Sequence, residues 1–343
     1  MKALLLTSPG VLEYLDAPEP EMGADDVLIR VRAVGICGSD VHGVDGSSGR
    51  RVPPLVMGHE AAGVIEAVGV SVGGWAPGDE VTFDSTISCG RCPFCVEGQD
   101  NLCDDRRVLG VATDEYRRDG AFAEWLAVPA RVVYAVPAGV SMVEAALAEP
   151  LAVALHAVAR TALAKHDAVL VVGCGVIGLL VIAAARQAGA GRVIAVDLSP
   201  SRLARATAMG ATDVVPAGTD DLADQLRALT GGRGPDVAFE AVGIGSTVAL
   251  AIAAVRKGGT VVLVGNVVSA VELPLQWTVS RQLTLLGSAA SCGEYPRALE
   301  LIAGRAIDVA ALVSEVAPLA DGAAWFDRLR EPQTPLLKVV LEP

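Results

Sequence analysis

Residues 168–178 read AVLVVGCGVIG, a run of five apolar residues followed by glycines in the spacing G-x-G-x-x-G. A short run that is apolar throughout is typical of a strand buried on both faces of a parallel sheet. The alanine-rich residues after the glycines, to about Ala188, contain no proline and favour a helix. The stretch therefore predicts a strand, a tight glycine turn and a helix, which together form the first unit of an α/β fold.

A second apolar strand, Arg192 to Val196, ends at Asp197, which lies 24 residues after Gly173. With an acid at this distance, the glycine spacing becomes a Rossmann fingerprint, in which a dinucleotide pyrophosphate approaches the turn and the helix N-terminus. Asp197 would bind the adenosine ribose and repel a 2′-phosphate, so we expect NAD rather than NADP, a preference that Arg202 softens. The alternative is a structural turn without cofactor. Loop contacts with the dinucleotide are expected at Gly173, Gly175, Val176, Ile177 and Gly178.

Strands and helices continue to alternate over residues 201–288, which predicts a doubly wound parallel sheet with right-handed crossovers. Ligands of such sheets bind beside the carboxyl ends of the strands. Val242, Gly265 and Asn266 directly follow predicted strands. We therefore expect these three residues to lie against the nicotinamide half of the cofactor.

The composition is typical of a soluble α/β enzyme, with 52% hydrophobic residues and a net charge of −13 over 343 residues. The length allows two domains, because single cores stop growing at about 250–300 residues. The acidic balance argues against nucleic acid or an anionic membrane as partner. Residues 168–185 are apolar enough for a short membrane span, but the buried strand, turn and helix explain them better. No signal peptide pattern is visible at the N-terminus, so we expect a cytoplasmic protein.

Four cysteines fall within fifteen residues in the pattern C-x2-C-x2-C-x7-C. Four thiolates at this spacing can close a tetrahedral structural zinc site with no open position. An iron–sulfur cluster and a redox CxxC motif are the alternatives. The bacterial cluster pattern places proline after its last cysteine, whereas Asp104 stands there in this chain. The predicted zinc ligands are Cys89, Cys92, Cys95 and Cys103.

A second group of metal-binding residue types spans Cys37 to Glu60, which contains CGSDVH and GHE. The alternating strand Val27 to Val34 runs directly into Cys37, so a rigid element would hold this thiol. Cysteine, histidine and carboxylate are the ligand types of zinc, and a catalytic zinc keeps one position open. Cys37, His59 and Glu60 are candidate ligands, and a further protein ligand must come from elsewhere in the chain.

The composition changes near residue 150. The residues before it form short strands separated by glycine and proline turns, which favour a small β-barrel-like domain. Beyond it, strands and helices alternate until about residue 289. A last helix, Pro296 to Ala303, and a last strand, Leu336 to Leu341, are expected to return to the first domain.

These motifs together resemble the zinc-containing medium-chain dehydrogenases, in particular the sorbitol and polyol dehydrogenase branch. The resemblance rests on the order of CGSDVH, GHE, the four-cysteine lobe, EPLAVALH at residues 149–156 and the glycine loop ending in Asp197. It implies a GroES-like catalytic domain over 1–150 and 290–343, with the structural zinc lobe at 89–103. A Rossmann domain for NAD is then expected over 151–289.

The resemblance also implies individual roles. Glu149 matches a further ligand of the catalytic zinc beside Cys37 and His59, which makes two zinc ions per chain. Glu60 matches a carboxylate that is a direct ligand only in some states. Ser39 matches the hydroxyl that touches the substrate oxygen, and His42 the outer end of a proton relay through the cofactor ribose. The implied reaction is hydride transfer between NAD and a secondary alcohol or its ketone.

The substrate stays open at this point. Gly43 follows His42 where sorbitol dehydrogenases tend to have an aromatic residue, and the loop 45–51 carries Arg50 and Arg51. These arginines could bind a substrate phosphate or lie in a solvated loop, so polyols, cyclitols and polyol phosphates all remain. A threonine-type amino-alcohol dehydrogenase shares the Glu149 position, and an inactive cofactor-binding relative is the remaining alternative. Relatives imply a homodimer or homotetramer, for which we expect an edge strand at residues 261–264.

Overall fold

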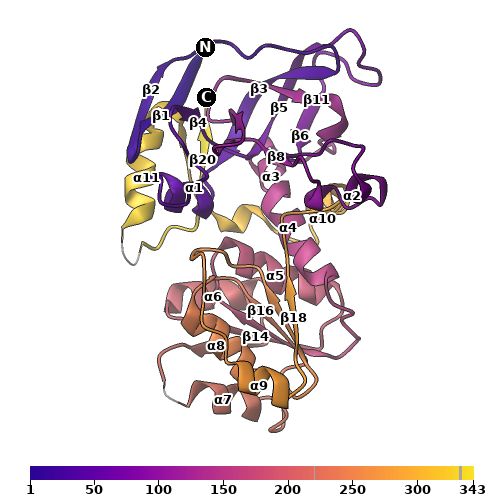
Figure 1. The fold of residues 1–343 in the computed structure, drawn as a ribbon, viewed down its shortest axis with the longest axis vertical. Helices are drawn as coiled ribbons and strands as arrows, with labels where there is room; N and C mark the ends of the chain where they lie inside the picture. Colours follow the sequence, from indigo (N-terminus) through magenta and orange to yellow (C-terminus); the bar gives the residue numbers. More distant parts are fainter. Residues whose placement is uncertain (220, 332–333) are drawn as a thin grey trace. The chain divides into compact units, whose positions relative to one another are not determined.

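The computed structural model describes residues 1–219, 221–331 and 334–343, and it divides into two compact units. The first unit joins Met1–Glu149 to Cys292–Pro343, and the second is Pro150–Ser291. Both chain termini lie in the first unit (Figure 1). The division falls between Glu149 and Pro150, inside the first turn of helix α4 (Ala148–Ala159).

The first unit is built on antiparallel strands. Its largest sheet has the order β12-β6-β5-β3-β20-β19, with β11 also paired to β3, and a smaller sheet has the order β2-β1-β4. Buried aliphatic and aromatic side chains from both sheets form one core. The strands are β1 (Lys2–Ser8), β2 (Val11–Asp16), β3 (Asp26–Gly35), β4 (Leu55–Val56), β5 (Glu60–Val68), β6 (Glu80–Phe83), β7 (Thr86–Ile87), β8 (Arg107–Val108), β9 (Val111–Ala112), β10 (Arg117–Arg118), β11 (Trp125–Pro129), β12 (Val133–Ala135), β19 (Val313–Pro318) and β20 (Lys338–Glu342).

The last part of the chain completes this sheet. Strand β20 pairs antiparallel with β3, with Val340 opposite Gly35, and parallel with β19. Strand β19, helix α11 (Gly322–Arg330) and the short helix at residues 38–43 were not predicted. The helices of this unit are α1 (Gly38–Gly43), α2 (Pro93–Val96), α3 (Met142–Ala146), the start of α4, α10 (Tyr295–Ala303) and α11.

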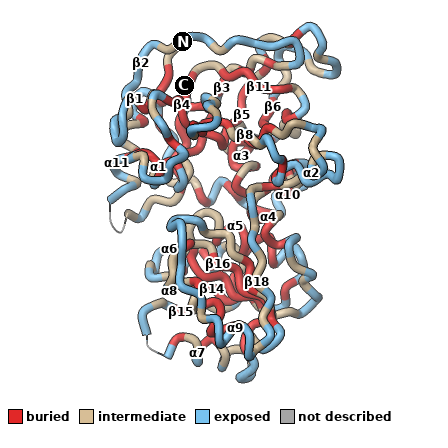
Figure 2. Tube along the Cα trace, in the orientation of Figure 1, coloured by how far each residue is buried: buried red, intermediate tan, exposed pale blue. Residues whose placement is uncertain are grey.

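The second unit contains the predicted parallel sheet, in the order β15-β14-β13-β16-β17-β18. Strands β13, β14 and β16 carry almost only buried residues, while exposed residues line the surrounding helices and loops (Figure 2). Its elements are β13 (Ala168–Val172), α5 (Val176–Gln187), β14 (Arg192–Asp197), α6 (Pro200–Ala208), β15 (Asp213–Pro216), α7 (Leu222–Ala228), β16 (Val237–Glu240), α8 (Gly245–Ala254), β17 (Thr260–Leu263), α9 (Leu275–Ser280) and β18 (Thr284–Gly287).

One expectation about this sheet is wrong. Strand β17, at residues 260–263, pairs with β16 on one side and β18 on the other, so residues 261–264 are not at an edge. Its apolar residues Val261 to Leu263 reflect this central position, because an inner strand of a parallel sheet is covered on both faces. The sequence also predicts a helix over residues 220–229, and the first residue of this range lies outside the described residues.

Helices α3 and α4 together form the segment Met142–Ala159, which is long and apolar enough to cross a membrane by length and composition alone. Within the protein 61% of this segment is buried. It also carries two carboxylates, Glu144 and Glu149. A buried core segment of a folded domain accounts for all three properties.

Candidate active site

Cys37 and His59 are brought together by the pairing of two strands. Cys37 precedes helix α1 just beyond the end of β3, and His59 directly precedes β5. Because β3 and β5 are antiparallel with Gly35 opposite Glu60, the end of one strand meets the start of the other. The candidate ligand atoms of Cys37, His59 and Glu60 all lie within 4.8 Å of one another. A thiol, an imidazole and a carboxylate at this spacing fit the ligand preferences of zinc.

The Glu149 carboxylate is not part of this group, whose ligand atoms all lie within 4.8 Å of one another. It lies in the first turn of α4, and its carboxyl responds to the charges of His59, Glu60 and Lys338. Burial raises the pKa of Glu149 to about 8, and the nearby Glu60 carboxylate contributes to this rise. The structure thus places the fourth predicted ligand in the surroundings of the cluster.

Lys338 is a residue of this site that the sequence reasoning missed. Its ammonium nitrogen lies 2.5 Å from Glu60 Oε2 and 2.9 Å from the carbonyl oxygen of Ile36, and its side chain is 2% exposed. Burial alone would lower the pKa of Lys338, but the charges of Glu60 and Cys37 raise it above its ordinary value. A lysine within the apolar run LLKVVL was the available signal, since a buried cation requires a partner.

Asp40 lies behind the imidazole of His59. The distance between His59 Nδ1 and Asp40 Oδ1 is 3.5 Å, so Nδ1 faces the carboxylate and Nε2 remains for Cys37 and a metal. Burial opposes ionisation of Asp40, yet the charges of His59 and Arg51 hold its pKa below the usual range. Burial also opposes the charged form of His59, while Asp40 and Cys37 raise its pKa well above the ordinary value. Such a carboxylate behind a ligating histidine fixes the ring orientation and tautomer.

Ser39 and His42 both lie on helix α1 and are exposed. The Ser39 hydroxyl lies 3.3 Å from the Cys37 sulfur. Residues three apart on a helix are neighbours on its surface, so the hydroxyl and the imidazole occupy the same side of α1. This arrangement allows a proton to pass from the vicinity of the cluster toward solvent.

The four-cysteine lobe lies around α2 and is assembled without distant segments. The sulfur atoms of all four cysteines lie within 4.8 Å of one another. Backbone N–H groups of Arg91 and Cys92 lower the pKa of the Cys89 thiol to about 6, whereas burial and neighbouring thiols raise that of Cys95 to about 12. This donor set fits a closed tetrahedral zinc site.

The glycine loop of the second unit has the geometry that the fingerprint requires. Gly173 has a φ of +94°, which disfavours residues with a side chain. A Cβ on Gly178 would collide with the Gly173 carbonyl oxygen, so only glycine allows the helix this close to the turn. Asp197 Oδ2 accepts a hydrogen bond from the Cys174 N–H at 2.7 Å, and Oδ1 accepts one from the Ser199 N–H at 2.8 Å.

Two further turns approach each other at the ends of β16 and β17. A Cβ on Gly265 would clash with the backbone of Val242, so these predicted cofactor residues are adjacent. Asn266 follows and is exposed. The buried Glu240, another residue missed by the sequence reasoning, accepts hydrogen bonds from the Val242 and Gly243 N–H groups at 2.9 and 2.8 Å. Its carboxylate therefore fixes the first of these turns.

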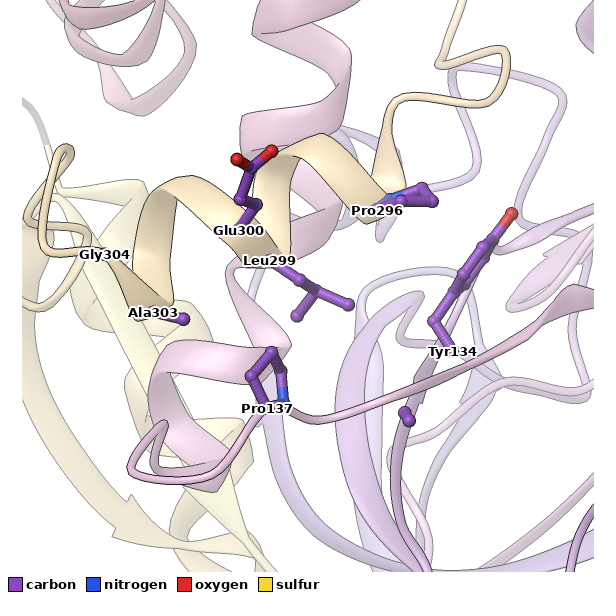
Figure 3. A pocket seen from close by; sticks show the side chains of 8 residues that line it. Tyr134, Pro137, Pro296, Leu299, Glu300, Ala303 and Gly304 are labelled. Atoms are coloured by element: carbon purple, nitrogen blue, oxygen red, sulfur yellow. The ribbon is translucent and has the colours of Figure 1, made fainter.

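A separate hollow of about 710 Å³ lies between β12 and α10 in the first unit (Figure 3). Its walls are mostly apolar, and Glu300 at its rim is paired with Arg297 at 2.7 Å. No predicted site residue contributes to it, so it lacks the convergent polar groups of a catalytic pocket. The lining residues are Tyr134, Ala135, Pro137, Pro296, Leu299, Glu300, Ala303 and Gly304.

Known proteins share both units of this chain. Residues 23–138 match the family model of the alcohol dehydrogenase GroES-like domain, and residues 176–304 match that of the zinc-binding dehydrogenases. Sorbitol dehydrogenase of Bacillus subtilis (strain 168) is 36% identical over 348 residues, covering 100% of this chain and 97% of the relative.

Solved structures of related proteins resemble this chain over its whole length. A zinc-binding dehydrogenase from Sinorhizobium meliloti 1021 with bound NADP has a TM-score of 0.91 and 34% identity, covering 100% of this chain and 99% of that one. Galactitol-1-phosphate dehydrogenase from Escherichia coli has a TM-score of 0.90 and 29% identity, covering 100% of both chains.

Proposed function

Because the chain belongs to the zinc-containing medium-chain dehydrogenases, in their sorbitol and polyol dehydrogenase branch, we propose that it transfers a hydride between NAD and a secondary alcohol. The substrate class is a polyol, a cyclitol or a polyol phosphate. The observation that carries this proposal is that the candidate ligand atoms of Cys37, His59 and Glu60 lie within 4.8 Å of one another, although Cys37 and His59 are 22 positions apart in the sequence.

Cys37, His59 and Glu149 would hold the catalytic zinc, and Glu60 would approach it only in some states. When bound, zinc lowers the pKa of a coordinated hydroxyl oxygen and so favours loss of its proton. The ion pair with Lys338 at 2.5 Å supports a secondary role for Glu60, because this carboxylate already has a buried counter-ion. Cys89, Cys92, Cys95 and Cys103 would hold a structural zinc.

The residues of helix α1 handle the substrate proton. The Ser39 hydroxyl, 3.3 Å from the Cys37 sulfur, accepts the proton of the substrate hydroxyl and donates its own onward. The exposed His42 exchanges that proton with solvent, because an imidazole can both accept and donate a proton. In ketone reduction the same two groups return the proton.

Asp197 supports NAD over NADP. Two backbone N–H groups hold its carboxylate in place, and a 2′-phosphate beside it would be repelled. A carboxylate has about four acceptor positions, so ribose hydroxyls can still bind it. Initial rates with both cofactors test this point. A higher kcat/KM with NADP would overturn it.

We further propose that the protein is a cytoplasmic homo-oligomer and that the second unit provides the contact. Strand β18 has a neighbour on one side only among the described strands of its sheet. The segment just before it exposes several apolar side chains, including Leu275 at 64%, Trp277 at 51% and Val279 at 69%. A patch of this kind is typical of protein–protein contacts. Sedimentation of the Trp277→Glu variant should show a smaller particle than the parent protein.

The main experiment measures NADH formation with polyols, polyol phosphates, inositols and threonine. The parent protein, Cys37→Ser and Glu149→Ala are compared after loading with zinc. Turnover of one substrate class that is lost in both variants would support the proposal. Turnover that survives both substitutions would refute the assigned zinc ligands, and turnover of threonine alone would favour an amino-alcohol dehydrogenase.

A further inference from the structure

Arg51 is one of two adjacent arginines in the loop 45–51, but its environment differs from that of Arg50. The side chain of Arg50 is exposed, whereas the guanidinium of Arg51 turns inward and its side chain is 5% exposed. Arg51 Nη2 lies 2.8 Å and Nε lies 3.2 Å from Asp40 Oδ1. Arg51 is therefore engaged inside the protein, and it is not available to a substrate phosphate.

Asp40 connects this arginine to the metal cluster. The same oxygen, Oδ1, that accepts both Arg51 hydrogen bonds lies 3.5 Å from His59 Nδ1. Asp40 is fully buried, so its charge requires a partner, and Arg51 provides it. Asp40 Oδ2 and His59 Nδ1 have no hydrogen-bond partner among the described residues. A slight rotation of the imidazole would bring its Nδ1 proton onto this carboxylate.

Arg51 also contacts the proposed proton-relay hydroxyl. Arg51 Nη2 lies 3.5 Å from Ser39 Oγ, which in turn lies 3.3 Å from the Cys37 sulfur. A guanidinium can only donate hydrogen bonds, so it faces a lone pair of the hydroxyl and leaves the Ser39 hydrogen free to point elsewhere. One nitrogen thus links the carboxylate behind His59 to the hydroxyl beside Cys37.

The loop backbone holds Arg51 in this place. Arg51 forms a parallel bridge to Ala112 in β9, where the Ala112 N–H donates to the Arg50 carbonyl oxygen at 3.2 Å. The Arg51 side chain also packs on Gly43 at the end of α1. A Cβ on Gly43 would lie 2.8 Å from Arg51 Cγ, so any larger residue would displace the arginine. The buried position of the Arg51 side chain therefore requires a glycine at position 43.

We propose that Arg51 is a positioning residue of the active site, which acts through Asp40 on His59 and directly on the Ser39 hydroxyl. This inference rests on the proposed zinc-dependent function. The planar fork of the guanidinium matches two directions at once, which a lysine ammonium cannot reproduce. Arg51→Lys should therefore keep the buried charge but lose the geometry of the contacts.

The test compares Arg51→Lys and Arg51→Met with Arg50→Met, the matched change at the exposed neighbour. The first readout is the rate at which zinc passes from the purified protein to a chromophoric chelator. The Cys37→Ser variant identifies the phase that belongs to the cysteine lobe. We expect the other phase to be about 10–100-fold faster in both Arg51 variants. The rate of zinc release from the cysteine lobe should be unchanged in the Arg51 variants. In the Arg50→Met protein both release rates should equal those of the parent.

The second readout is steady-state oxidation of whichever polyol the parent protein turns over. Both Arg51 variants should lose kcat with little change in KM, because Arg51 does not touch the substrate. Free guanidinium should partly restore kcat in Arg51→Ala, where the vacated space matches its shape.

Two outcomes would overturn the inference. One is zinc release at the parental rate with unchanged kcat in a folded Arg51→Lys protein. The other is a rise in KM confined to polyol phosphates, which would make Arg51 an anion contact. If Arg51→Met does not fold, Arg51→Lys still decides the question. Zinc release needs no substrate, so a parent protein that oxidises none of the alcohols would refute the proposed function and leave this test standing.

Discussion

The two metal-binding clusters of the first unit are built in opposite ways. The cysteine lobe takes all its ligands from fifteen consecutive residues, and three of its four cysteines are partly exposed. The Cys37 cluster takes its residues from the ends of two paired strands, and Lys338 reaches Glu60 across 278 positions of sequence. A local cluster can form wherever its short segment folds, whereas the assembled cluster requires the complete sheet, including the strand formed by the C-terminal residues.

The largest expected difference between the clusters is in turnover. Cys37→Ser should lower kcat by about 10³-fold or more, because the metal supplies several kcal/mol of charge stabilisation and each 1.36 kcal/mol is a factor of ten. Cys95→Ser should instead lower stability and leave the kcat of the remaining folded molecules close to that of the parent. Zinc content by mass spectrometry should fall to one ion per chain in each variant. Equal losses of kcat in both would mean that the clusters are not separate in function.

The buried ion pair of the assembled cluster should control stability. Lys338→Met leaves Glu60 buried without its counter-ion, and we expect a loss of roughly 3–5 kcal/mol in the free energy of unfolding. Arg107, near the cysteine lobe, offers a matched control, because its pair with Asp105 is 3.5 Å long and exposed. Arg107→Met should change stability by about 0–1 kcal/mol. Urea unfolding monitored by tryptophan fluorescence makes the comparison, and similar small changes in both variants would contradict it.

The cysteine lobe should show unequal thiol reactivity once zinc is removed. The pKa of Cys89 is lowered to about 6 and that of Cys95 is raised to about 12. At pH 7.5 the first thiol is therefore mainly thiolate and the second mainly protonated, and only the thiolate reacts. Iodoacetamide should label Cys89 at least about tenfold faster than Cys95. Peptide mapping over time checks the order, and faster labelling of Cys95 would disprove it.

The smallest effect is expected at the start of the helix pair that delivers Glu149. Ser141 accepts a hydrogen bond from the Glu144 N–H, and the Glu144 carboxylate accepts one from the Ser141 N–H at 2.9 Å. Ser141→Ala should cost about 1 kcal/mol of stability with little change in kcat. A drop in kcat larger than the loss of folded protein would show that this cap also positions Glu149.

The loss of stability expected for Ser141→Ala should depend on pH. Burial opposes ionisation of Glu144, but hydrogen bonds from Ser141 and the ion pair with Arg305 lower its pKa in the folded state. A lowered folded pKa stabilises the protein above the unfolded value of about 4.3. The stabilisation is lost as the pH falls through the folded pKa. The difference between the parent and Ser141→Ala should therefore shrink below about pH 4.

Much of the fold was predictable because its signals are local. The apolar run 168–172, the glycine turn and the acid at Asp197 identified the parallel sheet, which the structure confirms. The alternation of strands and helices predicted over residues 201–288 is also confirmed. Strand β19 and helix α11 were missed. Strand β19 is short and half-exposed and shows no clear alternation, whereas α11 is amphipathic but has only nine residues, of which Gly322 and Phe326 are buried.

The sequence alone determined which chemical groups are present and which of them are adjacent along the chain, and so it indicated the cysteine lobe and the glycine loop. The tertiary structure decided which residues from distant segments contact these groups and which side chains are buried. It placed β17 inside the sheet, paired Lys338 with Glu60, and turned Arg51 inward to Asp40 while Arg50 remained exposed. The physical reason is that burial and charge pairing depend on contacts between distant segments. Two adjacent arginines have the same chemistry, and only packing gives them different roles.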